Sequence, residues 1–266
     1  MDTTALISMI DDPRCGYETK GFCSIVVGII DIVTVHYDLY KNFNIFIDDD
    51  NVLDIFYQKG SVTEDYYDAV PPYIDEYIQG KFEHLPNANR VADLKNILKK
   101  RRIMDEVISL KKYYVDEFEQ KKREFGITDN TLGIHLRGTD KSWETPRPLL
   151  VDIFKTVDQE LDSHDKIFLS TDELFLLNVM SSRYGKDLII YDEEAKISDG
   201  NAPVHKSNLH IRKQINREIM QSVYMLSKCK TLAYSFSNVS HLALIMGADS
   251  ISKAVSINTG IGIDIG

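Results

Sequence analysis

Short apolar runs alternate with longer amphipathic stretches through the second half of the chain. Five of these runs are rich in β-branched and aromatic side chains and are bounded by polar residues, which is typical of buried strands. They cover residues 131–136, 166–170, 188–191, 231–234 and 254–257. The stretches between them have a helical period and predict helices over residues 148–161, 173–184, 209–226 and 239–247. Strands and helices in alternation predict an α/β fold with a parallel, doubly wound sheet.

The first half of the chain follows a different pattern. Apolar residues recur at spacings of three and four over residues 21–35, which predicts a buried helix, and residues 43–47 alternate like a strand. Residues 89–125 have a helical period over a charged background, which predicts one long helix or two in succession. Their basic run at 99–102 is interpreted as a solvated helix face, since acidic residues follow it. The change of pattern predicts two domains, residues 1–126 and 127–266.

The charge of the chain limits the partners that it can have. The chain has 266 residues, 43% of them hydrophobic, and a formal net charge of −10 at pH 7. An acidic surface repels a long polyanion, so nucleic acid is not an expected partner. A small anionic ligand such as a nucleotide requires a local basic pocket.

Cysteine usage and hydropathy indicate the cellular setting. The three cysteines, Cys15, Cys23 and Cys229, have no CxxC spacing, which argues against a zinc knuckle or a redox pair. The N-terminus has no basic region of the kind that begins a signal peptide. The longest apolar stretch, residues 22–35, is shorter than the roughly 20 residues that a bilayer span needs. We therefore expect a cytoplasmic protein without a membrane span.

Polar residues follow three of the predicted parallel strands. In an open α/β sheet, ligands bind in the crevice outside the carboxyl ends of the strands. The polar groups are His135 and Arg137 after the first strand, Thr171 and Asp172 after the second, and Ser235, Phe236, Ser237 and Asn238 after the fourth. We expect these segments to lie at one edge of the sheet.

Two interpretations of these strand ends are open. Arg137 offers a planar fork of donors that suits a diphosphate, and the start of the helix after Ser237 or Asn238 is an anion site. Alternatively, Arg137 forms a structural ion pair with Asp140 or Asp172, His135 is a hydrogen-bonded core residue, and the serine and asparagine only cap the helix.

Four short segments, in the same order along the chain, resemble one family. The run His-Leu-Arg-Gly-Thr-Asp-Lys at 135–141 is similar to the His-x-Arg-Arg-x-Asp motif of α1,6-fucosyltransferases, nodulation fucosyltransferases and protein O-fucosyltransferases. The Phe-Leu-Ser-Thr-Asp-Glu run at 168–173 matches in register, and Tyr-Ser-Phe-Ser-Asn at 234–238 resembles the family's Thr-Phe-Ser-Ser motif. Residues 14–22 resemble the family's glycine-rich start.

The resemblance implies a GT-B-like fold with two Rossmann-like halves, an acceptor-side half at 1–126 and a nucleotide-sugar half at 127–266. It implies an inverting, metal-independent transfer of a sugar from a nucleotide diphosphate to a glycan hydroxyl, with no cofactor. On this resemblance Arg137 binds the β-phosphate and His135 contacts the nucleotide. Thr171 and Asp172 line the nucleotide pocket, and the segment from Ser235 and Phe236 to Ser237 and Asn238 holds phosphate.

The catalytic base is expected to be a carboxylate that reaches the acceptor hydroxyl from the face opposite the diphosphate. Glu144 is within one position of a glutamate that the α1,6-fucosyltransferases carry, and Asp140 and Lys141 are nearby alternatives. Gly138 stands where the family has a second arginine. This departure leaves the donor open between a GDP-sugar such as GDP-fucose and a UDP-sugar such as UDP-xylose.

Two other function classes are compatible with the sequence. The strand at 43–47 runs into Asp48-Asp49-Asp50, and Asp-x-Asp after a strand is how a metal-dependent GT-A transferase holds a divalent ion. The loss of the second arginine at Gly138 also suits a non-catalytic module that binds a sugar or a nucleotide.

Overall fold

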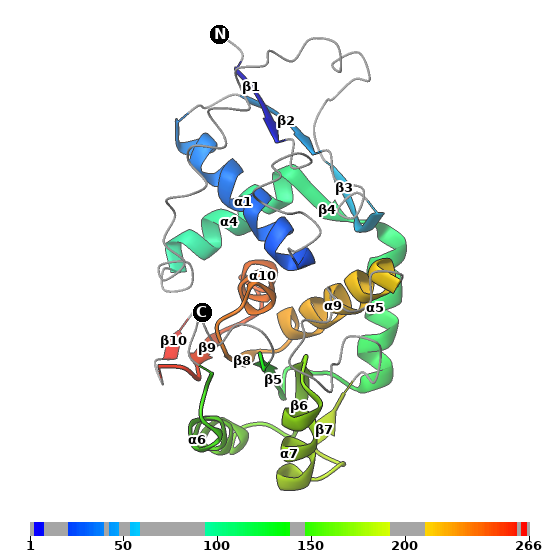
Figure 1. The fold of residues 1–266 in the computed structure, drawn as a ribbon, viewed down its shortest axis with the longest axis vertical. Helices are drawn as coiled ribbons and strands as arrows, with labels where there is room; N and C mark the ends of the chain where they lie inside the picture. The colour runs from blue at the N-terminus through cyan, green and yellow to red at the C-terminus, as the bar shows by residue number, and fades with distance from the viewer. Residues whose placement is uncertain are drawn as a thin grey trace. The chain divides into compact units, whose positions relative to one another are not determined.

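The computed structural model describes residues 3–7, 21–39, 43–47, 54–58, 94–138, 147–191, 211–259 and 262–264. The chain divides into two compact units, Met1–Tyr114 and Val115–Gly266 (Figure 1). The division lies within helix α5 (Lys112–Phe125), so most of this helix belongs to the second unit. The sequence placed the boundary after α5, near residue 126, and the roles assigned to the two domains stay predictions.

The first unit is built around a βαβ element. Strands β1 (Thr3–Ile7) and β2 (Phe43–Ile47) pair in parallel and are connected through α1 (Phe22–Leu39), which confirms the helix predicted at 21–35 and the strand predicted at 43–47. Helix α4 (Leu94–Val107) is separated from α5 by the short strand β4 (Ile108–Leu110). The remaining strand, which pairs with β4 in antiparallel orientation, is β3 (Phe56–Gln58).

Helix α4 packs on α1, and one member of its basic run is not solvated. Lys100 is buried, and its Nζ lies 2.6 Å from Oδ1 of Asp31 on α1. The interpretation of residues 99–102 as a solvated face is therefore wrong for Lys100. A lysine and an aspartate of opposite charge can share a buried site because each compensates the other's desolvation.

The second unit contains a six-stranded sheet in the order β10-β9-β8-β5-β6-β7. Its strands are β5 (Thr131–Leu136), β6 (Lys166–Thr171), β7 (Ile189–Ile190), β8 (Thr231–Tyr234), β9 (Lys253–Ser256) and β10 (Gly262–Asp264). The first five are parallel, as the sequence predicted, and β10 is an antiparallel addition. The chain proceeds from β5 to one side and later crosses to the other at β8, so the switch point of a doubly wound sheet lies between these two strands.

Helices cover both faces of this sheet (Figure 1). Leu132, Ile134 and Leu136 of β5 form a core cluster with residues of α6 (Leu150–Leu161) and α7 (Leu174–Tyr184). The alternate residues of β5 face α9 (Arg212–Ser227), which packs on α10 (Asn238–Met246). A Cβ added to Gly133 would lie 3.0 Å from Cβ of Cys229, so glycine permits this close approach of the chain after α9.

Helix α5 is attached to α9 within the second unit. The rings of Phe118 and Tyr224 lie 5.5 Å apart, and the Tyr224 hydroxyl donates to Oε1 of Glu119 at 2.6 Å. This hydrogen bond lowers the pKa of Glu119, because it stabilises the carboxylate form.

Within the described ranges, no helix has the length and apolar character needed to cross a bilayer. The cytoplasmic location stays a prediction.

Candidate functional site

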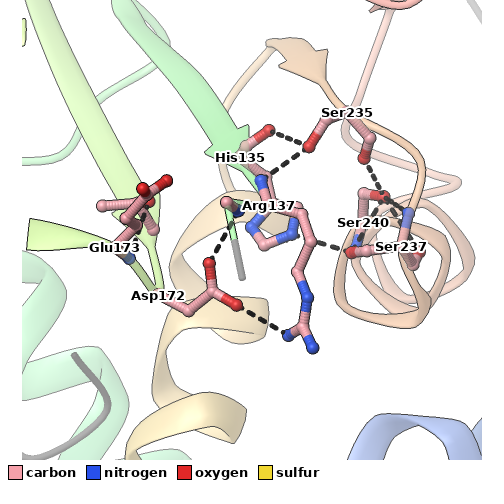
Figure 2. Close-up of polar contacts among 9 residues, drawn as sticks. His135, Arg137, Asp172, Glu173, Ser235, Ser237 and Ser240 are labelled. Carbon is pink, nitrogen blue, oxygen red and sulfur yellow. Dashed lines mark hydrogen bonds and ion pairs between the residues drawn. The ribbon is translucent and has the colours of Figure 1, made fainter. Parts of the chain in front are cut away.

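Three parallel strands of the second unit deliver polar side chains to the same edge of the sheet (Figure 2). They end side by side because β5 lies between β6 and β8 in register. The groups that come together are His135 in β5 and Arg137 just after it, Asp172 and Glu173 just after β6, and Ser235, Ser237 and Ser240 from the segment after β8.

Ser235 ties the ends of β5 and β8 together at the switch point. Its backbone N–H donates to the carbonyl of His135 at 2.9 Å, and its Oγ accepts from the backbone N–H of Arg137 at 2.7 Å. Ser235 is 2% exposed, so water does not compete for these bonds. The backbone that carries Arg137 is thereby held against the start of the segment that leads into α10.

His135 is fixed at the N-terminus of α10. It is 3% exposed, and its Nε2 lies 2.7 Å from Oγ of Ser237, the N-cap residue of that helix. Ser237 and Ser240 also form a capping box through reciprocal side-chain to backbone bonds of 3.2 and 3.1 Å. The backbone N–H groups of Asn238 and Val239 lie outside these bonds, at the positive end of the helix dipole, which favours an anion there.

Arg137 forms an ion pair with Asp172. The distance between Nη1 and Oδ2 is 3.0 Å, and the two side chains are 18% and 13% exposed. The other carboxylate oxygen, Oδ1, accepts from the backbone N–H of Gly138 at 2.9 Å. The ion-pair interpretation is therefore confirmed for Asp172. The ion pair fixes the orientation of the guanidinium at this edge of the sheet.

Glu173 occupies the space beside Gly138. A Cβ built on Gly138 would lie 1.8 Å from Oε2 and 2.7 Å from Cβ of Glu173. The carboxylate end of Glu173 could rotate away, but its Cβ moves only with the backbone. Glycine at 138 and glutamate at 173 therefore belong together, and position 138 has no room for the second arginine of the fucosyltransferase motif.

No protein-family model and no curated protein sequence matches the chain. Solved structures match it at low sequence identity. The fucosyltransferase NodZ from Bradyrhizobium superposes with a TM-score of 0.58 at 12% identity, over 90% of this chain and 96% of that one. NodZ α1,6-fucosyltransferase co-crystallised with GDP gives a TM-score of 0.54 at 11% identity, over 90% and 94% of the two chains. This chain has the NodZ fold.

The NodZ fold confirms the GT-B-like α/β class that the motifs implied. The similarity covers nearly the whole of both chains, so it includes the sheet that carries the polar site as well as the first unit. At identities this low it establishes the fold alone, and the chemistry of this chain has to be argued from its own residues.

The other predicted site residues within the described ranges, Thr171, Phe236 and Asn238, belong to the turns and the helix start that surround the site. Thr171 is buried, and its Oγ1 accepts from the backbone N–H of Glu173 at 3.3 Å, so it shapes the turn. The backbone N–H of Phe236 donates to Oδ1 of Asn258 at 3.0 Å, which ties the segment to the end of β9. Asn258 was missed, because no local pattern distinguishes it. Asn238 is the first residue of α10.

Several candidates lie outside the described residues. They are Asp140, Lys141 and Glu144, proposed for the base, and the Asp48-Asp49-Asp50 run proposed for a metal. In the part of the chain that the structure describes, no group of three His, Cys, Asp or Glu side chains could hold a metal ion.

Two buried groups of the second unit stay protonated at neutral pH. Tyr234, in register with His135, is 1% exposed, and burial raises its pKa to about 12. Burial also raises the pKa of the Cys229 thiol to about 12. Neither residue is therefore suited to act as a base or as an anionic nucleophile.

Proposed function

We propose that the chain is a glycosyltransferase that moves a sugar from a nucleotide diphosphate sugar to a glycan hydroxyl. One observation carries the proposal: Arg137, His135 and the N-terminus of α10 meet at the switch point of a doubly wound sheet. A guanidinium and a helix start at adjacent strand ends form a site for a diphosphate. The shared fold with NodZ supports this assignment.

Arg137 has the main electrostatic role in the proposed reaction. The bond between the sugar C1 and the phosphate oxygen breaks while the acceptor oxygen bonds to C1, and the nucleotide diphosphate leaves with the bonding electrons. Arg137 and the N–H groups at the start of α10 stabilise the charge that develops on the leaving phosphate. This is the role that a divalent ion has in metal-dependent transferases, so we propose a metal-independent reaction.

The acceptor oxygen attacks C1 from the face opposite the diphosphate, which inverts the configuration at C1, and its proton goes to a base on that face. We propose Glu144 as this base, with Asp140 and Lys141 as alternatives in the same segment. Replacing Glu144 with Gln is expected to lower the rate of transfer about 10²- to 10⁴-fold while the affinity for the nucleotide is unchanged. Unchanged transfer would exclude Glu144, and the same assay on Asp140→Asn and Lys141→Met then tests the alternatives.

The donor is proposed to be a GDP-sugar, because NodZ was crystallised with GDP. A UDP-sugar such as UDP-xylose is the alternative, since Gly138 stands where the fucosyltransferase motif has a second arginine. A thermal-shift series with GDP, UDP, ADP and their sugars decides between them, because a ligand that binds only the folded state raises Tm. Stabilisation by GDP that is lost in Arg137→Ala supports the proposal, and stabilisation by none of the nucleotides contradicts it.

A non-catalytic binding module is the second candidate, favoured by the neutralisation of Arg137 by Asp172. Incubation of the purified chain with GDP-sugars and glycan acceptors, in excess EDTA, separates the two candidates. Release of GDP in EDTA supports a metal-independent enzyme. Binding without turnover supports the module, and turnover only after addition of Mn²⁺ would support the metal site at Asp48–Asp50.

A further inference from the structure

A second group of side chains lies next to the diphosphate site, at the start of α7. Nη2 of Arg147 lies 2.5 Å from Oε2 of Glu173, and the guanidinium carbon of Arg147 lies 5.9 Å from the centre of the Phe175 ring. Glu173 is the N-cap residue of α7, yet its carboxylate makes no capping bond and faces Arg147 and Gly138 instead. We call Arg147, Glu173 and Phe175 the rim cluster.

The rim cluster adjoins the proposed donor site through consecutive residues. Asp172, which holds Arg137 and the backbone of Gly138, is followed directly by Glu173, whose side chain occupies the space where a Cβ on Gly138 would lie. A ligand on the rim cluster is thus beside the position where the donor diphosphate would bind.

The chemistry of the rim cluster suits an uncharged sugar. The carboxylate of Glu173 and the guanidinium of Arg147 neutralise each other, so the cluster does not select a cation or an anion. Both groups are planar and can exchange hydrogen bonds with neighbouring hydroxyls. The Phe175 ring is 52% exposed and offers an apolar face against which the C–H groups of a pyranose can pack.

We infer that the rim cluster is an acceptor subsite on the second unit that holds a neutral pyranose ring of the glycan, in addition to the acceptor side expected in residues 1–126. The inference rests on the proposed function, because the bound ring is placed to present a hydroxyl to the donor sugar. The competing view, a surface ion pair next to an isolated exposed aromatic residue, gives Phe175 no ligand. The two views differ in one measurable property, the binding of simple sugars.

Saturation-transfer NMR of the full chain with the methyl β-glycosides of glucose, galactose, mannose and N-acetylglucosamine tests the inference. At least one glycoside is expected to bind, and Phe175→Ala to weaken that binding about tenfold, which corresponds to about 1.4 kcal/mol. Glu173→Gln is expected to weaken it less. Val151→Ala, which removes another exposed apolar side chain at the start of α6, is the matched control and should leave binding unchanged.

The outcomes separate this inference from the proposed function. Arg137→Ala is expected to lose GDP binding and keep glycoside binding. Glycosides that do not bind to a chain that binds GDP, or binding that Phe175→Ala leaves intact, would overturn the subsite alone. Once transfer is measured, Phe175→Ala should raise the KM for the acceptor about tenfold with the KM for the donor within about twofold.

Discussion

Two arginine–aspartate ion pairs lie in the second unit, and they differ in position, distance and exposure. Arg137 and Asp172 join two strand ends at 3.0 Å, with side chains 18% and 13% exposed. Arg183 and Asp158 join α7 to α6 at 2.6 Å, with side chains 44% and 47% exposed. The pair with the shorter distance is the more exposed one, so distance alone does not indicate a functional role. Burial and a position at the carboxyl edge of the sheet distinguish the pair of Arg137 and Asp172.

The further contacts of the two ion pairs support the same distinction. Arg183 also stacks on the ring of Phe154 at 4.5 Å, and Asp158 accepts from the Tyr184 hydroxyl at 2.9 Å. These contacts join α6 to α7. Asp172 instead holds the backbone of Gly138, and Arg137 is anchored through Ser235 to the switch point. The first pair fastens two helices, whereas the second organises a site.

The largest expected difference is in catalysis. Arg137→Ala should lower the rate of sugar transfer about 10²- to 10³-fold, because a donor to the leaving phosphate is lost. Arg183→Ala, the matched control, should leave the rate within about twofold. Steady-state kinetics with a GDP-sugar measure both. Equal losses in the two variants would remove the functional distinction between the pairs.

A glycine lies near each ion pair, Gly138 near Asp172 and Gly185 near Arg183, and the two positions require glycine for different reasons. Gly138→Ala should lower the free energy of unfolding by about 1–3 kcal/mol, because the new Cβ overlaps Glu173. Gly185, which ends α7 with φ of 80°, has open space around it, so Ala there costs only backbone strain of about 1–2 kcal/mol.

A second substitution distinguishes the two glycines. Glu173→Gly removes the overlapping Cβ while glycine remains an acceptable N-cap residue, so it should restore the stability of Gly138→Ala and not that of Gly185→Ala. Urea denaturation of the single and double variants measures the coupling. Additive losses for Gly138→Ala and Glu173→Gly would contradict the packing argument.

Substitution of Asp172 and of Asp158 should have different, more moderate effects on the affinity for GDP. Asp172→Asn keeps an oxygen for the Gly138 N–H but loses the charge that orients Arg137, so the affinity for GDP should fall about tenfold, as for loss of one charge-assisted hydrogen bond. Asp158→Asn should leave it unchanged. Isothermal titration calorimetry with GDP compares them. Tighter binding by Asp172→Asn would instead show that Asp172 competes with the phosphate for Arg137.

The smallest effect concerns pH. The hydrogen bond from Arg183 lowers the pKa of Asp158 below its ordinary value. A lowered carboxyl pKa stabilises the fold above the pKa of the unfolded chain, about 3.9, and this contribution is lost as the pH falls through the lowered value. Asp158→Asn should therefore lower Tm slightly at pH 7, and the Tm values of the two proteins should converge once the pH falls below the lowered pKa of Asp158. A difference that is constant with pH would mean that the ion pair is not its cause.

Much of the second unit was predictable because its elements have local signatures. The strand at Thr131–Leu136 and the helix after Ser237 follow from hydrophobic period and capping residues, which depend on neighbours within a few positions. The three-residue strand β10 was missed, since so short a segment has no period to detect. In the first unit, β1 was missed because a five-residue run without a turn signal resembles many others.

The sequence alone predicted that a histidine, an arginine and a helix start stand at the ends of parallel strands, because the βα alternation predicts parallel strands whose carboxyl ends share one edge. Only the folded chain selected Asp172 as the partner of Arg137 and brought Glu173 over Gly138. It also buried Lys100 against Asp31. These contacts join segments far apart in the chain, and strand register and helix packing set them. No local pattern of residues records that information.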